Sequence, residues 1–193
     1  MKCLAFNLLL IIGFVVISCS YQVNKMPAKT SPSATEENVN EWKLFSSTKG
    51  RFSILIPEIP VEDKIPVDSG DAQLEMYAFK LVTFAAFSVM YYDVPPSLES
   101  SPEEILSNMI SGGVEQVKGR ILEEKQITLN NFPGRFLRIE AGDGTTVKVK
   151  LYVVDQRVYQ IMIQLPNTKG LSEDEKQSHE RIADQFLESF KLV

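Results

Sequence analysis

Residues 134–165 read GRFLRIEAGDGTTVKVKLYVVDQRVYQIMIQL, and this stretch decides the fold. Apolar residues recur at every second position through three runs, 134–141, 145–154 and 158–165, with turn residues between the runs. A period of two is typical of strands that bury one side of a sheet. The stretch therefore predicts three antiparallel strands joined by tight loops.

The first loop sets the register of the first two strands. A three-residue loop at 142–144, Gly-Asp-Gly, would place Ile139 opposite Val147 and Leu137 opposite Val149. Glycine after aspartate suits the left-handed residue of such a loop. Because this segment joins two strands and precedes no helix, it lacks the context of a phosphate-binding loop.

A second three-residue loop, 155–157, would set the register of the last two strands. We predict this loop because it keeps the apolar residues of all three strands on one side of the sheet. The pairs that it would create are Val153 with Tyr159, Leu151 with Ile161 and Val149 with Ile163.

The opposite side of the same hairpins mixes aromatic, cationic and apolar residues, and we call it the candidate partner face. Arg138 would lie opposite Lys148, a like-charge pair that costs up to about 1 kcal/mol unless an acid is near. Either Glu140 or a helix supplies that acid, or the face receives an anionic or peptide partner. Its residues are Phe136, Arg138, Lys148, Lys150, Tyr152 and Met162.

Other runs predict the rest of the sheet. The stretch 84–92 is apolar on both sides except at Ser88, as expected for a central strand that is covered on both faces. The charged residues 123–126 suit an exposed edge, where charge discourages pairing with other chains. Further strands are predicted at 52–56, 73–81 and 121–128.

Two segments begin with the same helix-capping pattern. Ser101 and Ser172 are each followed three residues later by glutamate, and Pro102 suits the first helical position. The first helix should end near Gly119, and Gly112-Gly113 within it suggests close packing on a neighbour. Together with the strands, these helices predict an α+β domain in which an antiparallel sheet of about six or seven strands carries helices on both faces.

The N-terminus predicts export and a lipid anchor. Residues 1–18 have Lys2 at the start, an apolar core at 8–17 and Ser18 before Cys19. The segment is short for a membrane-spanning helix. The residues Val16-Ile17-Ser18-Cys19 resemble the bacterial lipobox, which implies a cysteine that carries diacylglycerol. A disulfide with Cys3, or an ordinary thiol at Cys19, is the alternative.

Location and domain order follow from this interpretation. Residues 19–40 are polar and rich in Ser, Thr and Pro, which predicts a flexible lipidated linker. Residues 41–193 then form one globular domain. In lipoproteins, Asp directly after the cysteine favours inner-membrane retention; Ser20 therefore favours the outer membrane facing the periplasm, with the inner membrane as the alternative. Removal of residues 1–18 leaves a net charge of −6, which argues against nucleic-acid binding.

Residues 42–193 resemble a group of exported bacterial, often cyanobacterial, proteins that are distantly similar to the PsbP superfamily. The resemblance implies an α/β/α sandwich around an antiparallel sheet that is used for binding and for photosystem assembly. Metal-carrier roles are suggested for relatives, but no ligand pair matches here, so we expect neither a metal nor a cofactor. The motifs that carry the resemblance are Trp42-x-x-Phe45, Gly50 to Pro57, Pro133-Gly134-Arg135, Tyr152-Val153-Val154, Arg157-Val158-Tyr159 and Phe186-Leu187-x-Ser189-Phe190.

Three further segments are weaker candidates for sites. His179 is the only histidine and falls in the apolar stripe of the second helix, so it should lie in or at the rim of the core. The acidic segment 68–71 is a turn or, alternatively, a source of oxygen ligands for a cation. The segment 91–96, Tyr-Tyr-Asp-Val-Pro-Pro, either bridges core and solvent or forms a recognition edge.

Two functions are compatible with these patterns. The first is a membrane-anchored, non-catalytic binding or assembly module that presents the candidate partner face or the loop 92–100 to a protein partner. The second is a small-ligand or metal carrier, or a hydrolase, that works with Glu140, Asp143 or His179. The first fits the sequence better because no nucleophile and base occur in a recognised pattern.

The lipid anchor gives the first testable prediction. Cys19→Ala removes the sulfur that would carry the lipid, so the variant should move from the membrane fraction to the soluble fraction. Fractionation of cells followed by immunoblotting measures this, with Ser20→Ala as the neighbouring control that should stay on the membrane. A Cys19→Ala variant that still sediments with membranes would show that the anchor assignment is wrong.

Overall fold

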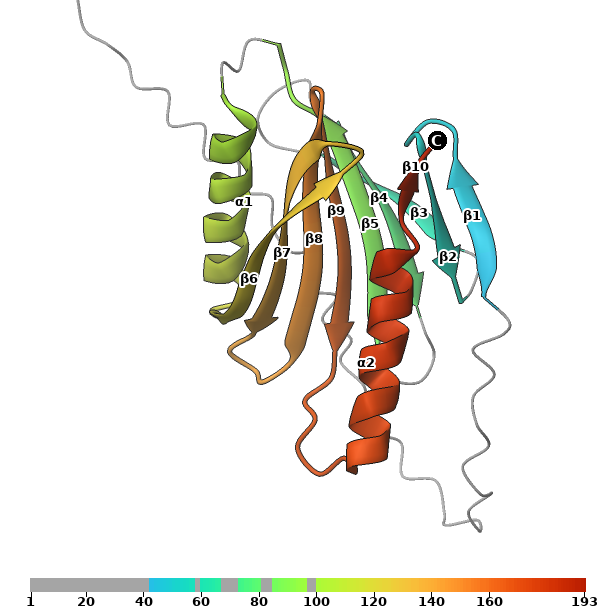
Figure 1. Ribbon diagram of the computed structural model, residues 1–193, viewed down its shortest axis with the longest axis vertical. Coiled ribbons are helices and arrows are strands. Elements are labelled where there is room, and N and C mark those ends of the chain that lie inside the picture. The colour runs from blue at the N-terminus through green and yellow to red at the C-terminus, as the bar shows by residue number, and fades with distance from the viewer. Residues whose placement is uncertain (1–41, 58–59, 67–72, 81–84, 97–99) are drawn as a thin grey trace, which may run out of the picture.

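The described chain forms two antiparallel sheets and two helices (Figure 1). The computed structural model describes residues 42–57, 60–66, 73–80, 85–96 and 100–193. The predicted signal peptide (1–18), the predicted linker (19–40) and the acidic turn at 68–71 lie outside these residues. The α+β class and the antiparallel pairing that the sequence predicts are confirmed.

The larger sheet has seven strands, and its order matches the composition of its strands. The central strand β5 is covered on both faces, and the charged strand β6 lies at one edge, as the sequence predicts. The strands are, in spatial order, β3 (Val61–Pro66), β4 (Gln73–Lys80), β5 (Ala86–Asp93), β9 (Arg157–Leu165), β8 (Thr146–Val154), β7 (Phe132–Glu140) and β6 (Arg120–Leu129).

A second sheet of three strands corrects the expectation of a single sheet. It consists of β1 (Lys43–Ser47), β2 (Phe52–Ile56) and β10 (Lys191–Leu192), in the order β1-β2-β10. Only β2 was predicted, because β1 is mostly exposed and polar and β10 has two residues. Phe52 and Ile54 are fully buried, so β2 packs its apolar residues onto the larger sheet and takes hydrogen-bonding partners from both ends of the domain.

Helices α1 (Pro102–Gln116) and α2 (Glu173–Glu188) cover opposite faces of the larger sheet. Both begin with the predicted capping box, in which the serine hydroxyl accepts from the third helical N–H and the glutamate accepts from the serine N–H. On β5, Met90 packs in the core under α1, whereas Val89 packs in the core under α2. Neither described helix is long and apolar enough to cross a membrane.

The register of the first hairpin is as predicted, and that of the second is not. Ile139 pairs with Val147 and Leu137 with Val149. Between β8 and β9, however, the turn has two residues, Asp155 and Gln156, and Asp155 adopts a φ of 54°. The observed pairs are Val153 with Val158, Leu151 with Gln160 and Val149 with Met162.

This one-residue shift changes which residues share a face. Lys150 now pairs with Ile161 and Lys148 with Ile163, so lysines and isoleucines lie side by side. Met162, which was assigned to the candidate partner face, lies on the opposite face in the core under α1. The prediction failed because it assumed that lysine could not share a buried face, and α2 provides carboxylates for these lysines.

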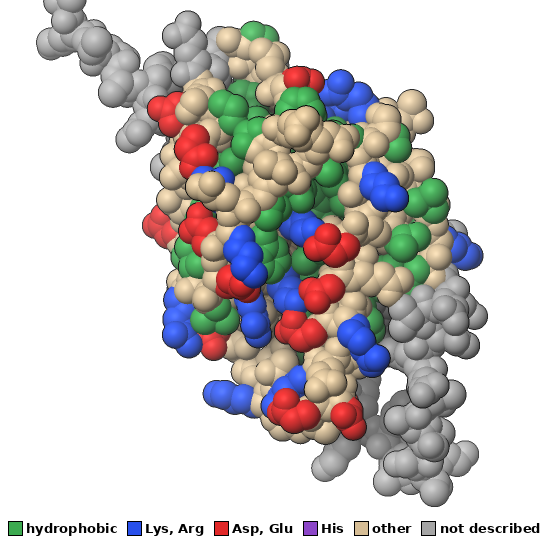
Figure 2. Space-filling view, viewed as in Figure 1, with side chains coloured by type: hydrophobic (Ala, Val, Ile, Leu, Met, Phe, Trp, Pro, Cys, Tyr) green, Lys and Arg blue, Asp and Glu red, His purple; other side chains and the backbone are tan. Residues whose placement is uncertain are grey.

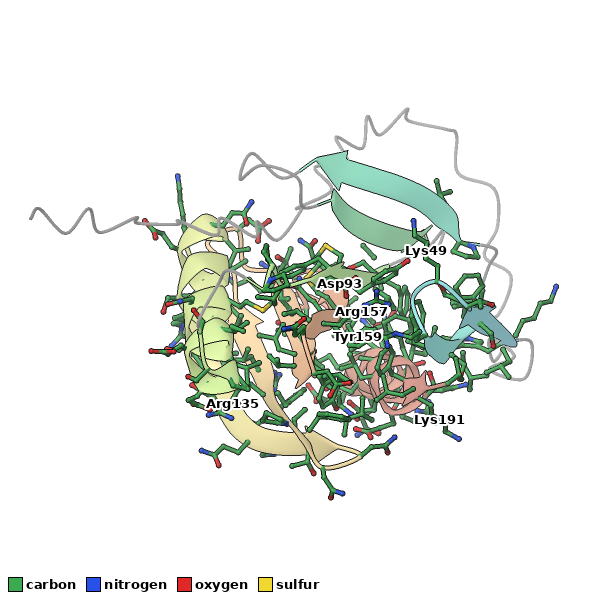
Figure 3. The ribbon with its side chains drawn as sticks, turned by 90° about the horizontal axis from the view of Figure 1, so that it is seen from above. Lys49, Asp93, Arg135, Arg157, Tyr159 and Lys191 are labelled. Atoms are coloured by element: carbon green, nitrogen blue, oxygen red, sulfur yellow. The ribbon has the colours of Figure 1, made fainter. Side chains whose placement is uncertain are left out.

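A polar clamp joins the two sheets at the end of β5 (Figure 3). The Arg157 guanidinium donates to both carboxylate oxygens of Asp93, at 2.6 and 2.7 Å, and to the Lys49 carbonyl at 2.8 Å. The hydrogen bond from Arg157 lowers the pKa of Asp93, so the pair stays charged. The Tyr159 hydroxyl donates to the Gly50 carbonyl at 2.7 Å.

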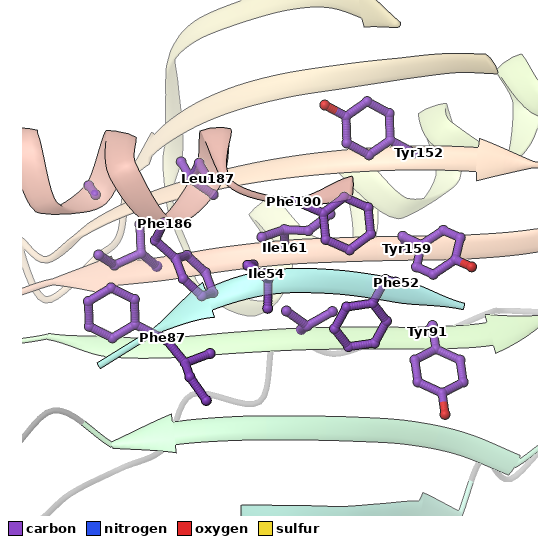
Figure 4. Close-up of a cluster of buried hydrophobic side chains, with 14 of the residues drawn as sticks. Phe52, Ile54, Phe87, Tyr91, Tyr152, Tyr159, Ile161, Phe186, Leu187 and Phe190 are labelled. Atoms are coloured by element: carbon purple, nitrogen blue, oxygen red, sulfur yellow. The ribbon is translucent and has the colours of Figure 1, made fainter. Parts of the chain in front are cut away.

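Aromatic rings fill the space behind this clamp (Figure 4). The Phe52 ring lies 5.5 Å from Phe190 and 6.0 Å from Tyr91, measured between centroids. The Phe87 ring meets Phe186 of α2 edge-on at 4.9 Å. These contacts connect β2, β5 and α2, so the smaller sheet and α2 form one layer against the larger sheet.

The sequence suggested that both glycines of α1 allow close packing on a neighbour, but the structure does not support this for Gly112. Gly113 is buried, but a Cβ placed on Gly112 would have no atom within 4 Å outside its own helix. Close packing therefore does not explain Gly112. Glycine at this position loses more backbone entropy on folding than alanine would, and this destabilises the helix.

We accordingly expect Gly112→Ala to stabilise the protein. The free energy of unfolding should rise by roughly 0.5–1 kcal/mol, the difference in helix propensity between the two residues. Urea-induced unfolding followed by circular dichroism measures this change. A decrease in stability would mean that α1 packs more tightly at this position than the structure indicates.

Candidate binding groove

Two lysines of β8 lie buried beneath α2, and each meets a carboxylate of that helix. Lys148 Nζ lies 2.9 Å from Asp184 Oδ1 and also contacts Glu180, while its side chain is only 6% exposed. Lys150 Nζ lies 2.7 Å from Glu188 Oε1. Glu180, Asp184 and Glu188 are spaced four residues apart, so they form one row along α2 above the lysines.

This row explains the like-charge pair predicted from the sequence. Arg138 and Lys148 do lie opposite each other, and Glu180 of α2 contacts both, at 3.7 Å from Arg138 Nη2. The helix therefore supplies the missing acid. Glu140, the other candidate acid, pairs instead with Arg120 at 2.6 Å.

As a result, most of the candidate partner face is not an open surface. Helix α2 covers Lys148, and the face is hollow beside the C-terminal part of α2. There the structure has a groove of about 580 Å³ between the β6–β7 hairpin and α2. The space-filling view shows hydrophobic side chains in this region beside acidic side chains along α2 (Figure 2). The groove is lined by Lys125, Ile127, Thr128, Leu129, Phe136, Lys150, Tyr152, Asp184, Leu187, Glu188 and Phe190.

The hairpin wall of the groove depends on a tight turn. Asn130 and Asn131 both have positive φ, 49° and 70°, as in the two-residue turns that asparagine favours. The turn places Ile127 and Leu129 on the same side of the sheet as Phe136, where they pack against the apolar core under α2. Lys125 Nζ lies 5.9 Å from the centre of the Phe136 ring, which extends this wall with a cation.

The floor and the far wall come from β8 and α2. The Tyr152 ring stacks on Phe190 with 6.3 Å between centroids and an interplanar angle of 8°. Burial, together with the nearby Glu188 carboxylate, raises the pKa of Tyr152 to about 12, so its hydroxyl stays protonated at neutral pH and can donate a hydrogen bond. Asp184 and Glu188 have side chains that are 62% and 74% exposed, and they give this wall a negative rim.

This arrangement is suited to binding an apolar group. The described lining has no histidine, cysteine or serine, so it offers no nucleophile with an adjacent imidazole base. Across the described residues, no group of three or more His, Cys, Asp and Glu side chains could hold a metal ion. The groove combines aromatic rings, aliphatic side chains, the hydroxyls of Tyr152 and Thr128, two exposed carboxylates and two lysines, Lys125 and Lys150.

The other predicted candidates lie apart from the groove. His179 is half-buried near the start of α2, in line with the expected position at the core's rim. Asp143 accepts hydrogen bonds from the N–H and hydroxyl of Thr145, at 2.9 and 2.7 Å, and so shapes the β7–β8 loop. Tyr91 and Tyr92 are buried on opposite faces of β5, which matches a role in the core. Of the loop 92–100, residues 97–99 lie outside the described part.

Sequence reasoning identified Phe136, Lys150 and Tyr152 but missed the rest of the groove. Ile127 and Leu129 alternate with polar residues at the end of β6, a signal that was visible in the sequence. The contribution of Leu187, Glu188 and Phe190 was not visible, because it depends on where α2 crosses β8.

No protein family and no curated protein matches this chain by sequence. Among solved structures, the cyanobacterial PsbP protein CyanoP from Synechocystis sp. PCC 6803 is similar, with a TM-score of 0.55 and 11% identity. The match covers 84% of this chain and 98% of CyanoP. A protein of unknown function from Pseudomonas aeruginosa, PA94, matches with a TM-score of 0.33 and 10% identity over 72% of this chain and 94% of PA94. The CyanoP match supports the distant PsbP-like fold that the sequence motifs imply.

We expect removal of the carboxylates around Lys148 to cost more stability than removal of the lysine charge itself. Glu180→Gln combined with Asp184→Asn leaves the Lys148 ammonium buried without a counter-charge and should lower the free energy of unfolding by about 2–4 kcal/mol. Lys148→Met keeps the volume and removes the charge, so its cost should stay below about 1 kcal/mol. Urea unfolding of both variants measures the difference. Equal costs would contradict a role of α2 as the counter-charge for this lysine.

Proposed function

We propose that this chain is a lipoprotein of the cell envelope that acts as a non-catalytic binding module. In this proposal Cys19 carries the lipid, the linker 19–40 holds the domain off the membrane, and the domain faces the periplasm from the outer membrane. The lipobox-like residues before Cys19 and the polar composition of 19–40 support the anchor and the tether.

The groove between the β6–β7 hairpin and α2 is the proposed binding site. The observation that carries this proposal is the combination of an apolar floor with exposed carboxylates on one wall. Leu187, Phe190 and Phe136 can surround an apolar side chain, and the Tyr152 hydroxyl can donate to a carbonyl beside it. Such a site fits a segment of another protein better than it fits a reaction.

Charge indicates what kind of segment would bind. Helix α2 carries six acidic side chains and two basic ones, and its exposed carboxylates Asp184 and Glu188 line the groove while they pair with Lys148 and Lys150. A partner segment should therefore carry lysine or arginine next to an apolar anchor residue, because opposite charges speed association and exclude acidic competitors. The acidic helix would repel an acidic segment.

A photo-reactive residue in intact cells tests this function. Thr128 is exposed and lines the groove, so a photo-reactive amino acid at this position should cross-link the domain to a second protein. Asn108 is exposed on α1, on the other face of the sheet, and is the control position that should give little adduct. Adducts of equal yield at both positions, or recovery of the uncross-linked chain alone, would overturn the proposed site.

A charge reversal tests the chemistry of the partner. Glu188→Lys places a cation at the mouth of the groove and should reduce the cross-link from position 128 several-fold, with the largest effect at low salt. The matched control is Glu115→Lys on α1, which is also exposed and should leave the yield unchanged. An increased yield with Glu188→Lys would show that the partner segment is acidic rather than basic.

A further inference from the structure

A second pocket lies at the opposite end of strands β6, β7 and β8 from the groove. Its volume is about 640 Å³, and it is bordered by the end of α1, the β7–β8 loop and the loop between β9 and α2. Three of its lining residues are cations, and they come from two parts of the chain: Lys118 and Arg120 lie where α1 leads into β6, and Lys169 precedes α2.

The acidic residues of this pocket already have partners. Glu140 accepts a hydrogen bond from Arg120, and that bond lowers the pKa of Glu140. Asp143 accepts from Thr145 within its own loop. Within the described residues no ion pair joins Lys118 or Lys169 to a carboxylate, although the charge of Lys169 also lowers the pKa of Glu140. The three cations of the pocket therefore exceed its two carboxylates, Glu140 and Asp143, by one positive charge.

The backbone around Lys118 holds that residue at the rim of the pocket. Lys118 has a φ of 47°, a left-handed conformation that costs a lysine about 1 kcal/mol or more. Its N–H donates to the Glu115 carbonyl at 3.0 Å, and the next N–H, of Gly119, donates to the Val114 carbonyl at 3.0 Å. The lysine could not sit one residue later in the chain, because a Cβ at position 119 would lie 2.7 Å from the Glu140 carbonyl oxygen.

The same hydrogen bonds reduce the partial negative charge that the C-terminal end of α1 presents to the pocket. The carbonyls of Val114, Glu115 and Val117 each accept a backbone N–H, the last from Gly142 at 2.9 Å. The N–H groups of the β7–β8 loop are also used internally, since Gly144 donates to Ala141 and Thr145 to Asp143. An anion would therefore be held by side chains and not by a backbone cradle.

From this arrangement we propose that the pocket binds a phosphate group through Lys118, Lys169 and Arg120. Arg120 would share its guanidinium between Glu140 and the phosphate, while the two lysines supply point charges. Because the whole chain has a net charge of −5, a general attraction of anions is not expected, and binding should be confined to this pocket. This site is separate from the groove and does not depend on the function proposed for it.

Two sources of phosphate are distinguished by two titrations of the isotope-labelled full-length chain in detergent. Inorganic phosphate is added at constant ionic strength in one titration, and phosphatidylglycerol is mixed into a zwitterionic detergent in the other. We expect saturable amide shifts at Gly142, Gly144 and Lys169 in at least one of them. Shifts with inorganic phosphate indicate a soluble ligand, and shifts with phosphatidylglycerol alone indicate a lipid headgroup. The absence of saturable shifts at these amides in both titrations would overturn the proposal.

A pair of double variants tests the residues. Lys118→Gly with Lys169→Ala removes two positive charges, and glycine adopts the positive φ of position 118 without strain. The dissociation constant for the ligand that shifts the wild type should rise about tenfold in this variant. Lys43→Ala with Lys191→Ala removes the same charge from exposed positions of the smaller sheet and should change it less than about twofold. Equal weakening by both double variants would mean that the ion binds only through overall charge, and the proposed site would be wrong.

Discussion

The need to bury both faces of the central strands governs this fold. Strands β5, β8 and β9 carry apolar side chains on each side, so each face requires its own cover. Helix α1 covers one face, whereas α2 and the smaller sheet together cover the other. The smaller sheet is held there by the hydrogen bonds from Arg157 and Tyr159 to the carbonyls of Lys49 and Gly50 and by the rings around Phe52, which come from segments far apart in the sequence.

The interface under α2 combines ion pairs with apolar contacts. Glu180, Asp184 and Glu188 of α2 meet Lys148 and Lys150 of the sheet, whereas Ile182, Ala183, Phe186 and Leu187 of the same helix are buried in the apolar core. Buried ion pairs contribute little net stability but disfavour alternative alignments, since a shifted helix would leave a lysine without a counter-charge. The row of charges thus fixes where α2 ends relative to β8, and that end forms one wall of the groove.

The two proposed sites differ in how the sheet creates them. The groove arises where the β6–β7 hairpin extends beside the end of α2 and leaves apolar residues partly uncovered. The proposed phosphate pocket arises at the opposite strand ends, where three connections meet and two of them contribute cations to the lining. Both lie on a rigid frame of paired strands, which is the arrangement that binding modules commonly use. The CyanoP match supports the fold of this frame, whereas the ligand of each proposed site depends on its surface residues.

The sequence by itself determined the helix starts, the central strand β5, the edge strand β6 and the first hairpin, because capping boxes, apolar runs and turn residues act over a few positions. It also identified Phe136, Lys150 and Tyr152 as members of a candidate face. It did not indicate β3, the strand at the other edge. Only the tertiary structure decided the register of β8 and β9, the separate sheet around β2 and the cover over Lys148. These features depend on partners more than thirty residues away in sequence, such as Asp184 beside Lys148 and Arg157 beside Asp93. A local pattern cannot show that a buried lysine will meet a carboxylate. For this reason the predicted pairing of β8 and β9 was wrong by one residue.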